Sequence, residues 1–318
     1  MLTLRRHNRR PRRSFGARSA LASATALAAA LLGMGSASAS PAPSPRTFEI
    51  GTFNMAGGNK DYNDAGEKAV NALYSSIVDR SPAFVTVQEA CEDWMEALDE
   101  KLSSYTIVFD PVTSGSGSTA QCKNEDSSDR SPFGNAVIYR KGLGFEGNVS
   151  NVGHSLGTTS GERREMLCVT SDLIKSVACS AHLSVDDAAQ RERELRKALK
   201  ILGDDYENFT HFLGGDFNAT PRSEELEQIY HRSYSRHADG DYQEVDSPCG
   251  ESMTPPEWSF DCRVGEYTHD DWWFEEQSPF AKKIDYLFVS PDAVTVNWAD
   301  ATTARYSDHD PLWASVTI

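Results

Sequence analysis

Positive charge is scarce in this sequence. The chain of 318 residues has 31 Lys and Arg against 47 Asp and Glu, a formal net charge of −16 at pH 7. Seven of the arginines lie in the first 18 residues, so beyond residue 39 only 24 basic residues face 47 acidic ones, a balance of −23. A field this negative excludes a protein that coats polyanions in general. Such a chain needs a metal ion or locally placed Arg and Lys wherever it holds a phosphate.

Long hydrophobic runs, internal repeats and domain-sized linkers are also absent. The longest apolar stretch, residues 20–34, includes Ser23 and Thr25 and is too short and too polar for a stable membrane span. Hydrophobic residues nevertheless make up 39% of the chain and aromatic residues 10%, which is enough for a core. Collagen-like, coiled-coil and fully disordered chains are therefore excluded. We predict a single domain over residues 47–318.

The first 39 residues have the three parts of an export signal. An arginine-rich start precedes the apolar stretch, and Ala37-Ser38-Ala39 offers a cleavage site. Arg12-Arg13 with the next two residues resembles a twin-arginine signal, whose passengers cross the membrane folded. The residues around it do not complete that pattern. We predict an export signal at 1–39, a Pro/Ser-rich linker at 40–46 and a secreted, extracellular protein, with twin-arginine export as one route.

All six cysteines lie in the exported part. An even number in an oxidising compartment favours disulfides, although the sequence allows fifteen pairings. Cys168 and Cys179 lie on two β-rich runs around a turn at residues 173–174, so a hairpin would place them opposite each other. Zinc is the competing explanation, but the cysteines lack a C-x-x-C pair and a His at ligand spacing. The predicted pairs are Cys168 with Cys179, Cys249 with Cys262, and Cys91 with Cys122.

Beyond the linker, β-branched or aromatic runs alternate with amphipathic stretches. The sequence predicts strands at residues 47–54, 84–88, 105–110, 135–140, 166–171, 176–182, 209–214, 284–290 and 311–318. Helices are predicted at residues 64–80, 92–103 and 187–202. The first would begin with the capping box Asp64-x-x-Glu67 and have a buried face of Ala65, Ala69, Ala72, Leu73 and Ile77. Residues 111–132 and 239–271 look irregular. Many strands, few helices and several hairpins predict an α+β fold of packed sheets covered by helices.

Acid, amide and imidazole side chains recur where the predicted strands end. A single acid after a strand is usually a turn residue or a helix cap, so each position alone is weak. Strand ends on rigid sheets are, however, where a precise polar constellation is most easily held. The residues at these ends are Asn54, Glu89, His182, Asp216, Asn218, Asp285, Asp308 and His309.

Five short motifs recur in a recognisable order. They resemble the motif series of the endonuclease/exonuclease/phosphatase superfamily, which includes pancreatic-type deoxyribonucleases, abasic-site endonucleases, inositol-phosphate phosphatases and neutral sphingomyelinases. The resemblance covers residues 47–318, and the last three motifs are the most specific. Ala181 stands where the family usually has Thr. The motifs are Gln88-Glu89, Ser180-Ala181-His182-Leu183, Gly215-Asp216-Phe217-Asn218, Ile284-Asp285-Tyr286 and Ser307-Asp308-His309-Asp310-Pro311.

The resemblance implies a four-layer α/β sandwich, with two mostly antiparallel sheets flanked by helices, and metal-dependent hydrolysis of phosphate esters. Glu89 matches the main metal ligand, and Asn54 and Asp308 complete or flank that site. Oxygen ligands of this kind suit Mg²⁺, with Mn²⁺ as the alternative and Ca²⁺ as a structural ion. Such a metal would neutralise charge on a phosphate oxygen and on the leaving group.

The remaining motif residues would act on the attacking water. His309 is the candidate base and Asp285 its orienting carboxylate, because a fixed anion stabilises an imidazole that gains a proton. Asp216 and Asn218 would hold the same water or a second metal, and the choice between His309 and Asp216 as proton acceptor stays open. His182 is expected to donate toward the phosphoryl or leaving oxygen.

Three further residues are candidates for substrate binding. Asn135 lies in a segment that resembles the Gly-Asn-Ala-containing strand of the family. Arg164 and Arg305 would make bidentate phosphate contacts. The alternative is that the two arginines are surface residues without a specific role.

The substrate is less determined than the reaction. Our first hypothesis is a nuclease that takes DNA or RNA as its substrate, although the negative balance argues against tight nucleic-acid binding. The alternative is a phosphomonoesterase or a sphingomyelinase-like phospholipase C acting on small phosphate esters or phospholipids, with Trp272-Trp273-Phe274 as an interfacial anchor. A third is a catalytically silent binding protein. The sequence indicates no protein partner, and we expect a monomer.

Overall fold

The computed structural model describes residues 45–59, 62, 66–124, 126–145, 153–158, 161–185, 187–247, 249, 262–270 and 281–318. Pro45–Ile318 form one compact unit. The predicted export signal and Trp272-Trp273-Phe274 lie outside the described residues. Within the described residues, no helix is both long and apolar enough to cross a membrane.

The first of two sheets has seven strands in the spatial order β12-β13-β1-β2-β5-β3, with β4 paired to β5. Its pairs are antiparallel except β1 with β2, which run parallel. The bounds are β1 (Thr47–Asn54), β2 (Phe84–Cys91), β3 (Tyr105–Pro111), β4 (Gln121–Lys123), β5 (Asp129–Arg140), β12 (Thr295–Ala301) and β13 (Leu312–Thr317).

The second sheet has six strands in the order β10-β11-β9-β8-β7-β6. Only β8 and β9 pair in parallel. The bounds are β6 (His154–Thr158), β7 (Arg163–Ser171), β8 (Ser176–His182), β9 (Thr210–Asp216), β10 (Gln243–Glu244) and β11 (Asp285–Val289).

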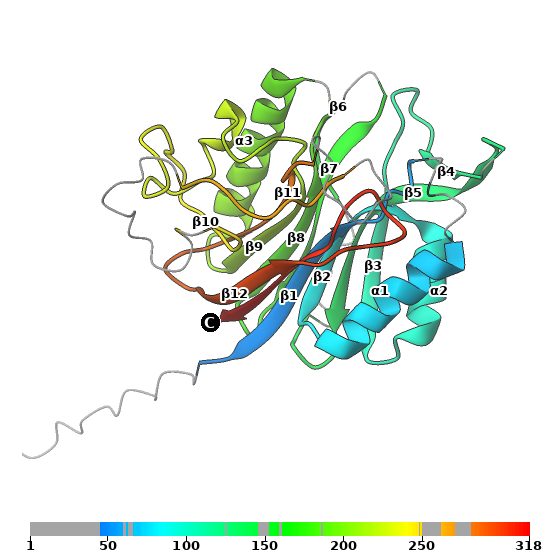
Figure 1. The fold of residues 1–318 in the computed structure, drawn as a ribbon, viewed down its shortest axis with the longest axis horizontal. Coiled ribbons are helices and arrows are strands. Elements are labelled where there is room, and N and C mark those ends of the chain that lie inside the picture. The colour runs from blue at the N-terminus through cyan, green and yellow to red at the C-terminus, as the bar shows by residue number, and fades with distance from the viewer. Residues whose placement is uncertain are drawn as a thin grey trace, which may run out of the picture. The chain divides into compact units, whose positions relative to one another are not determined.

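Helices cover the outer faces of both sheets. α1 (Gly66–Arg80) and α2 (Glu92–Lys101) lie beside the seven-stranded sheet, and α3 (Ala188–Asp205) lies on the far side of the six-stranded sheet (Figure 1). Three apolar clusters fill the spaces between the layers: one under α1 and α2, one between the sheets and one under α3. The predicted α+β class and four-layer sandwich are confirmed.

A buried polar connection joins the two sheets below the strand ends. Gln88 on β2 donates from Nε2 to Ser180 Oγ on β8 at 2.9 Å, and Ser180 donates back to the Val87 carbonyl at 2.8 Å. Both side chains are fully buried. Because buried polar groups are costly unless paired, these bonds favour one relative position of the sheets.

Most predicted elements form, with differences at their edges. α3 is capped by Asp187, whose side chain accepts from the amides of Ala189 and Gln190. On α1 the buried face comprises Ala69, Val70, Leu73 and Ile77, and the prediction that Ala72 is buried is wrong, since the helix turns it to solvent. The capping box at Asp64 and the predicted buried Ala65 lie outside the described residues.

Several strands were not predicted from the sequence. Residues 111–132 are not irregular throughout, because β4 pairs with an N-terminal extension of β5. β10 lies in the second segment that looked irregular, and β6 and β12 were not predicted. β12 is an edge strand with mostly exposed or half-buried residues, so it has little of the apolar alternation by which strands are recognised.

The three predicted disulfides are confirmed. Cys168 and Cys179 face each other across the β7–β8 hairpin, as expected from the turn between them. Cys249 joins Cys262, and Cys91 at the end of β2 joins Cys122 on β4. Three disulfides indicate an oxidising compartment.

Candidate active site

The polar residues predicted at the strand ends meet at one end of the sandwich. β1 and β2 bring Asn54 level with Gln88 on the first sheet. On the second sheet Asp216 pairs in register with His182 on β8 and with Asp285 on β11. These ends lie at the same edge because parallel neighbours finish together, and because β11 begins where the antiparallel β9 finishes.

Asn54 ties the two sheets together within the site. Its Nδ2 donates to Glu89 Oε1 at 3.2 Å and to Asp216 Oδ2 at 3.0 Å, while its Oδ1 accepts from the Ala56 amide at 2.9 Å. The side-chain oxygen of Asn54, which we expected to bind a metal, therefore accepts a hydrogen bond from the backbone. In this arrangement Asn54 holds two carboxylates of opposite sheets at a fixed separation.

Glu89 is held by an unusual backbone. It lies at an irregularity in the β2–β5 pairing and has a φ of 50°, in the left-handed region. The amides of Gly57 and Gly58 donate to the Glu89 carbonyl and to Oε2, both at 3.0 Å. A Cβ on Gly57 would lie 2.3 Å from that carbonyl oxygen and 2.6 Å from Cys91 Sγ. Only glycine therefore fits between the carboxylate segment and the Cys91–Cys122 disulfide.

His309 and Asp285 form a buried pair. His309 Nδ1 lies 2.8 Å from Asp285 Oδ2, and the exposed fractions are 5% and 0%. Thr268 Oγ1 accepts from the Asp285 amide at 2.9 Å, and Ser307 Oγ accepts from the His309 amide at 3.0 Å. Nε2 of His309 is thereby turned toward the centre of the site.

Asp216 occupies that centre. Its Oδ2 lies 3.7 Å from His182 Nε2 and 3.8 Å from His309 Nε2, and its Oδ1 accepts from the Asn218 amide at 2.8 Å. Asn218 has a φ of 49°, which asparagine tolerates, and its side chain donates to the Leu183 carbonyl. Through Asn54 and Asp216, Glu89 and His309 are linked by three short contacts. The convergence on which the predicted site depends is present.

The surroundings of His182 and His309 shift the pKa values of the two side chains in opposite directions. Burial, with the charges of Arg164 and His309, lowers the pKa of His182 well below its usual value. Burial acts in the same direction on His309, but the carboxylates of Asp285, Asp216 and Asp308 together outweigh it and raise the pKa of His309 to about 10. Burial and the nearby Asp285 raise the pKa of Asp216 to about 7, against the lowering effect of His309. Opposed shifts within one cleft are typical of acid–base sites.

The oxygen donors fit a hard divalent cation. Glu89 and Asp308 are partly exposed carboxylates, and among the described residues no Lys or Arg forms an ion pair with either. Asn59 Nδ2 donates to Asp308 Oδ2 at 2.9 Å and so orients it. Two carboxylates without a protein cation suit Mg²⁺, which takes few protein oxygens and keeps several waters. Asp216, Asp285 and His309 are a second group of potential ligands, with one atom of each within 4.8 Å of the others.

The predicted substrate residues differ in placement. Arg164 is buried beside His182, pairs with Glu162 at 2.9 Å, and has an Nε without a hydrogen bond in the described structure. Asn135 is buried and lies 3.5 Å from Glu165 Oε1. Arg305 is exposed, and among the described residues no hydrogen bond or ion pair joins it to the other candidates. The structure brings Arg164 beside His182, whereas the partner of Asn135 is Glu165 and Arg305 stands apart from the other candidates among the described residues.

Sequence reasoning missed several residues that hold this site. Gly58 and Asn59 orient Glu89 and Asp308, and the Gly-Gly-Asn run after β1 was the signal available for them. Thr268 supports Asp285. The His269 ring lies 4.7 Å from that of His309. No pattern in the sequence marks Thr268 or His269, because they come from a segment without regular structure.

Several solved structures have the same fold as this chain. An endonuclease/exonuclease/phosphatase family protein from Bacteroides thetaiotaomicron matches with a TM-score of 0.61 at 11% identity, over 86% of this chain and 98% of that chain. D. rerio TDP2 complexed with single strand DNA product matches at 0.57 and 17%, over 85% and 98%. The B. thetaiotaomicron VPI-5482 mannosyl-6-phosphatase matches at 0.59 and 13%, over 85% and 100%. These identities establish the fold alone.

Comparison of the sequence with curated proteins finds no match. The model of the Endonuclease/Exonuclease/phosphatase family, in contrast, matches residues 51–309, which include every candidate residue at the strand ends from Asn54 to His309. Those residues carry the carboxylates, amides and imidazoles that the fold brings together at one end of the sandwich. The chain therefore belongs to the endonuclease/exonuclease/phosphatase family and is a phosphoesterase with a buried Asp216, Asp285 and His309 cluster.

Proposed function

We propose that this protein is a secreted, Mg²⁺-dependent nuclease that hydrolyses phosphodiester bonds of DNA or RNA. The observation that carries the proposal is the meeting of Glu89, Asn54 and Asp216 from two sheets, with His182 and His309 beside them. That set offers a cation site and two imidazoles within reach of one phosphorus, as in-line phosphoryl chemistry requires. The three disulfides support secretion.

The residues divide the chemistry between them. Glu89 and Asp308 would hold the metal, with Asn54 and Asn59 orienting the two carboxylates. When bound, the metal neutralises charge on a non-bridging oxygen and on the leaving group. The attacking water gives its proton to the pair formed by Asp216 and His309, which Asp285 orients from behind. His182 and Arg164 face the developing negative charge on the other oxygens.

One observation favours hydrolysis of a nucleic acid over hydrolysis of a small monoester. The D. rerio TDP2 structure carries a single strand DNA product, so the fold accommodates a polynucleotide. The likeness to the mannosyl-6-phosphatase favours the phosphomonoesterase as the second candidate. The phospholipase hypothesis rests on Trp272-Trp273-Phe274, which lie outside the described residues.

A substrate panel tests the proposal. The mature protein with Mg²⁺ should nick supercoiled plasmid and lose this activity in EDTA. Release of inorganic phosphate from sugar or inositol phosphates, or of phosphocholine from sphingomyelin, with the plasmid intact would contradict it. The panel should include RNA, since the proposal covers both nucleic acids.

A further inference from the structure

A hollow of about 370 Å³ lies beside the candidate active site. Its walls come from residues 220–222, 263–265, 267 and 281–283. Just past the paired Asp216 and Asp285, the Phe217 amide donates to the Ile284 carbonyl and Tyr286 Oη donates to the Ala219 carbonyl. The hollow therefore continues from the end of the sandwich where the site lies.

The wall of this hollow also touches the site through His269. The backbones of Lys282 and His269 exchange two hydrogen bonds of 2.9 Å, and the His269 ring packs against His309. Lys282 is thus two contacts away from His309, one of the two residues of the proposed proton-accepting pair.

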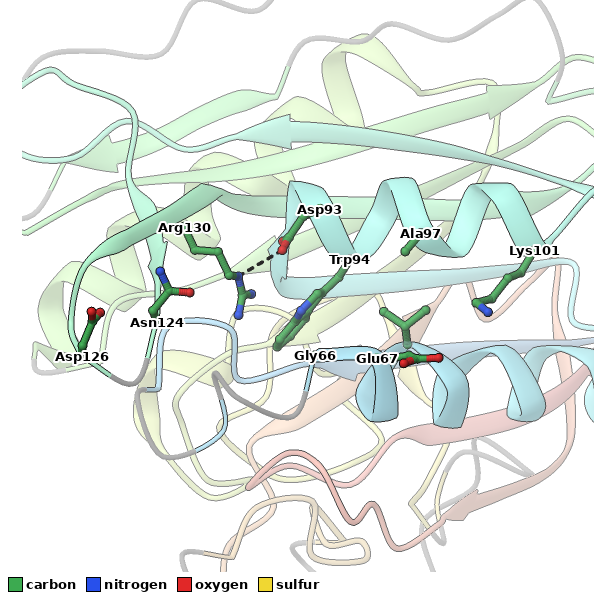
Figure 2. A pocket seen from close by; sticks show the side chains of 10 residues that line it. Gly66, Glu67, Asp93, Trp94, Ala97, Lys101, Asn124, Asp126 and Arg130 are labelled. Carbon is green, nitrogen blue, oxygen red and sulfur yellow. Dashed lines mark ion pairs between the residues drawn. The ribbon is translucent and has the colours of Figure 1, made fainter.

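The charge of the hollow differs from that of the chain. The described residues that line it include two Arg and two Lys but no Asp or Glu, whereas acids outnumber bases 47 to 31 in the whole sequence. The larger cavity near α2, about 620 Å³, is mixed: it is lined by Glu67, Asp93 and Asp126 as well as Lys101 and Arg130. Figure 2 shows Arg130 there directed at Asp93, 3.1 Å away.

The four cations of the hollow fall into two kinds. Lys283 is buried and pairs with Asp246 at 2.9 Å and with Glu244 at 3.3 Å, and Arg263 is buried 3.9 Å from Glu227. These two serve the fold. Arg222, Lys282 and Tyr267 are lining residues that are exposed, and Tyr267 is 49% exposed.

We propose that this hollow, called the Arg222–Lys282 hollow, binds the nucleotide next to the scissile phosphodiester. The flanking phosphate pairs with Arg222 and Lys282, and the base stacks on Tyr267. Local cations and an aromatic face are the two elements by which proteins hold single-stranded nucleic acid without reading its sequence. The inference rests on the proposed function. Arg222 and Lys282 would be the local cations that this acidic chain needs to hold a polyanionic substrate.

Two substrates separate this subsite from the chemistry. A single-stranded oligonucleotide fills the hollow, whereas bis(4-nitrophenyl) phosphate, a small diester, has no flanking phosphate or base. In Arg222→Ala/Lys282→Ala we expect the KM for the oligonucleotide to rise about 10-fold or more, and its dependence on salt to weaken by about one unit of slope per lost contact. Hydrolysis of the small diester should stay within about twofold of wild type.

Further variants keep the test independent of folding. Tyr267→Ala should raise the oligonucleotide KM about 5- to 100-fold, the range of one base stacked on an aromatic ring. Lys282→Arg should keep the wild-type KM. Lys101→Ala, which removes an exposed lysine of the mixed cavity, is the matched control and should change neither substrate.

The outcomes distinguish the subsite from the proposed function. If the wild type cleaves the oligonucleotide and both Arg222→Ala/Lys282→Ala and Tyr267→Ala retain its KM and salt slope, the subsite is wrong and the nuclease stands. If the wild type hydrolyses only the small diester, in a chelator-sensitive way, the nuclease proposal falls and the subsite with it.

Discussion

The two sides of the site are built differently. Glu89 and Asp308 are partly exposed and held by a Gly-Gly-Asn loop that a disulfide supports. Asp285 and His309 are buried: Asp285 pairs in register with Asp216 at the start of β11, and the hydroxyls of Thr268 and Ser307 accept from the backbone amides of Asp285 and His309. We call these the carboxylate side and the imidazole side. The difference indicates that the carboxylate side can exchange a hydrated ion with solvent, while the imidazole side is fixed before substrate arrives.

The largest expected effect is on the imidazole side. His309→Ala removes the partner of Asp285 and should lower kcat about 10²- to 10⁴-fold, the usual range for a positioned acid or base. The Mg²⁺ concentration for half-maximal activity should change less than about threefold. Hydrolysis of bis(4-nitrophenyl) phosphate over a Mg²⁺ series measures both quantities. A large shift in that midpoint would remove the distinction between the sides.

A substitution on the carboxylate side should produce the opposite result. Glu89→Gln keeps the shape but removes one negative charge, so the Mg²⁺ midpoint should rise about 10- to 100-fold. High Mg²⁺ should restore part of the rate, which it does not do for His309→Ala. Glu92→Gln, a nearby substitution at the start of α2, is the control and should behave as wild type.

Two of the disulfides should differ in their effect on the carboxylate side. Replacing Cys91 and Cys122 by Ala should cost about 2–4 kcal/mol of unfolding free energy and raise the Mg²⁺ midpoint about 3- to 10-fold, because the disulfide lies against Gly57. Replacing Cys168 and Cys179 should lower stability and leave the midpoint in place, since that bridge faces the cluster under α3. Urea unfolding and Mg²⁺ titration of both double variants measure the two effects. Equal midpoints would show that the disulfide does not position Glu89.

The smallest expected effect concerns pH. Burial and the Asp110 carboxylate raise the pKa of Glu165 to about 8 from 4.5, against Arg163. Its contribution to stability is complete below pH 4.5 and is lost as pH rises toward 8, because the unfolded chain releases the proton first. The loss is at most about 1.4 kcal/mol per pH unit.

Glu165→Gln cannot release that proton. Its stability relative to wild type should therefore increase from pH 5 to pH 8, by about 1–2 kcal/mol or more. Urea unfolding in EDTA at several pH values measures this difference. A constant difference would show that Glu165 does not retain its proton in the folded state.

The sequence predicted the parts of the site that strands carry. Asp216, His182 and Asp285 end or begin strands whose apolar residues reveal them, and the Cys168–Cys179 bridge followed from one hairpin. What it could not predict depends on backbone amides and irregular segments. Asn59 meets Asp308 across 249 positions of sequence, and Thr268 supports Asp285 from a segment without periodicity. Likewise, nothing in the pattern separates exposed Arg305 from buried Arg164.

The most direct test of the account is the location of the metal. Crystals soaked in Mn²⁺ should give an anomalous peak bonded to the Glu89 carboxylate, with Asp308 beside it and the hydrogen bond between His309 and Asp285 intact. A single peak bonded to Asp285 and His309, with nothing at Glu89, would contradict the assignment of a carboxylate side and an imidazole side.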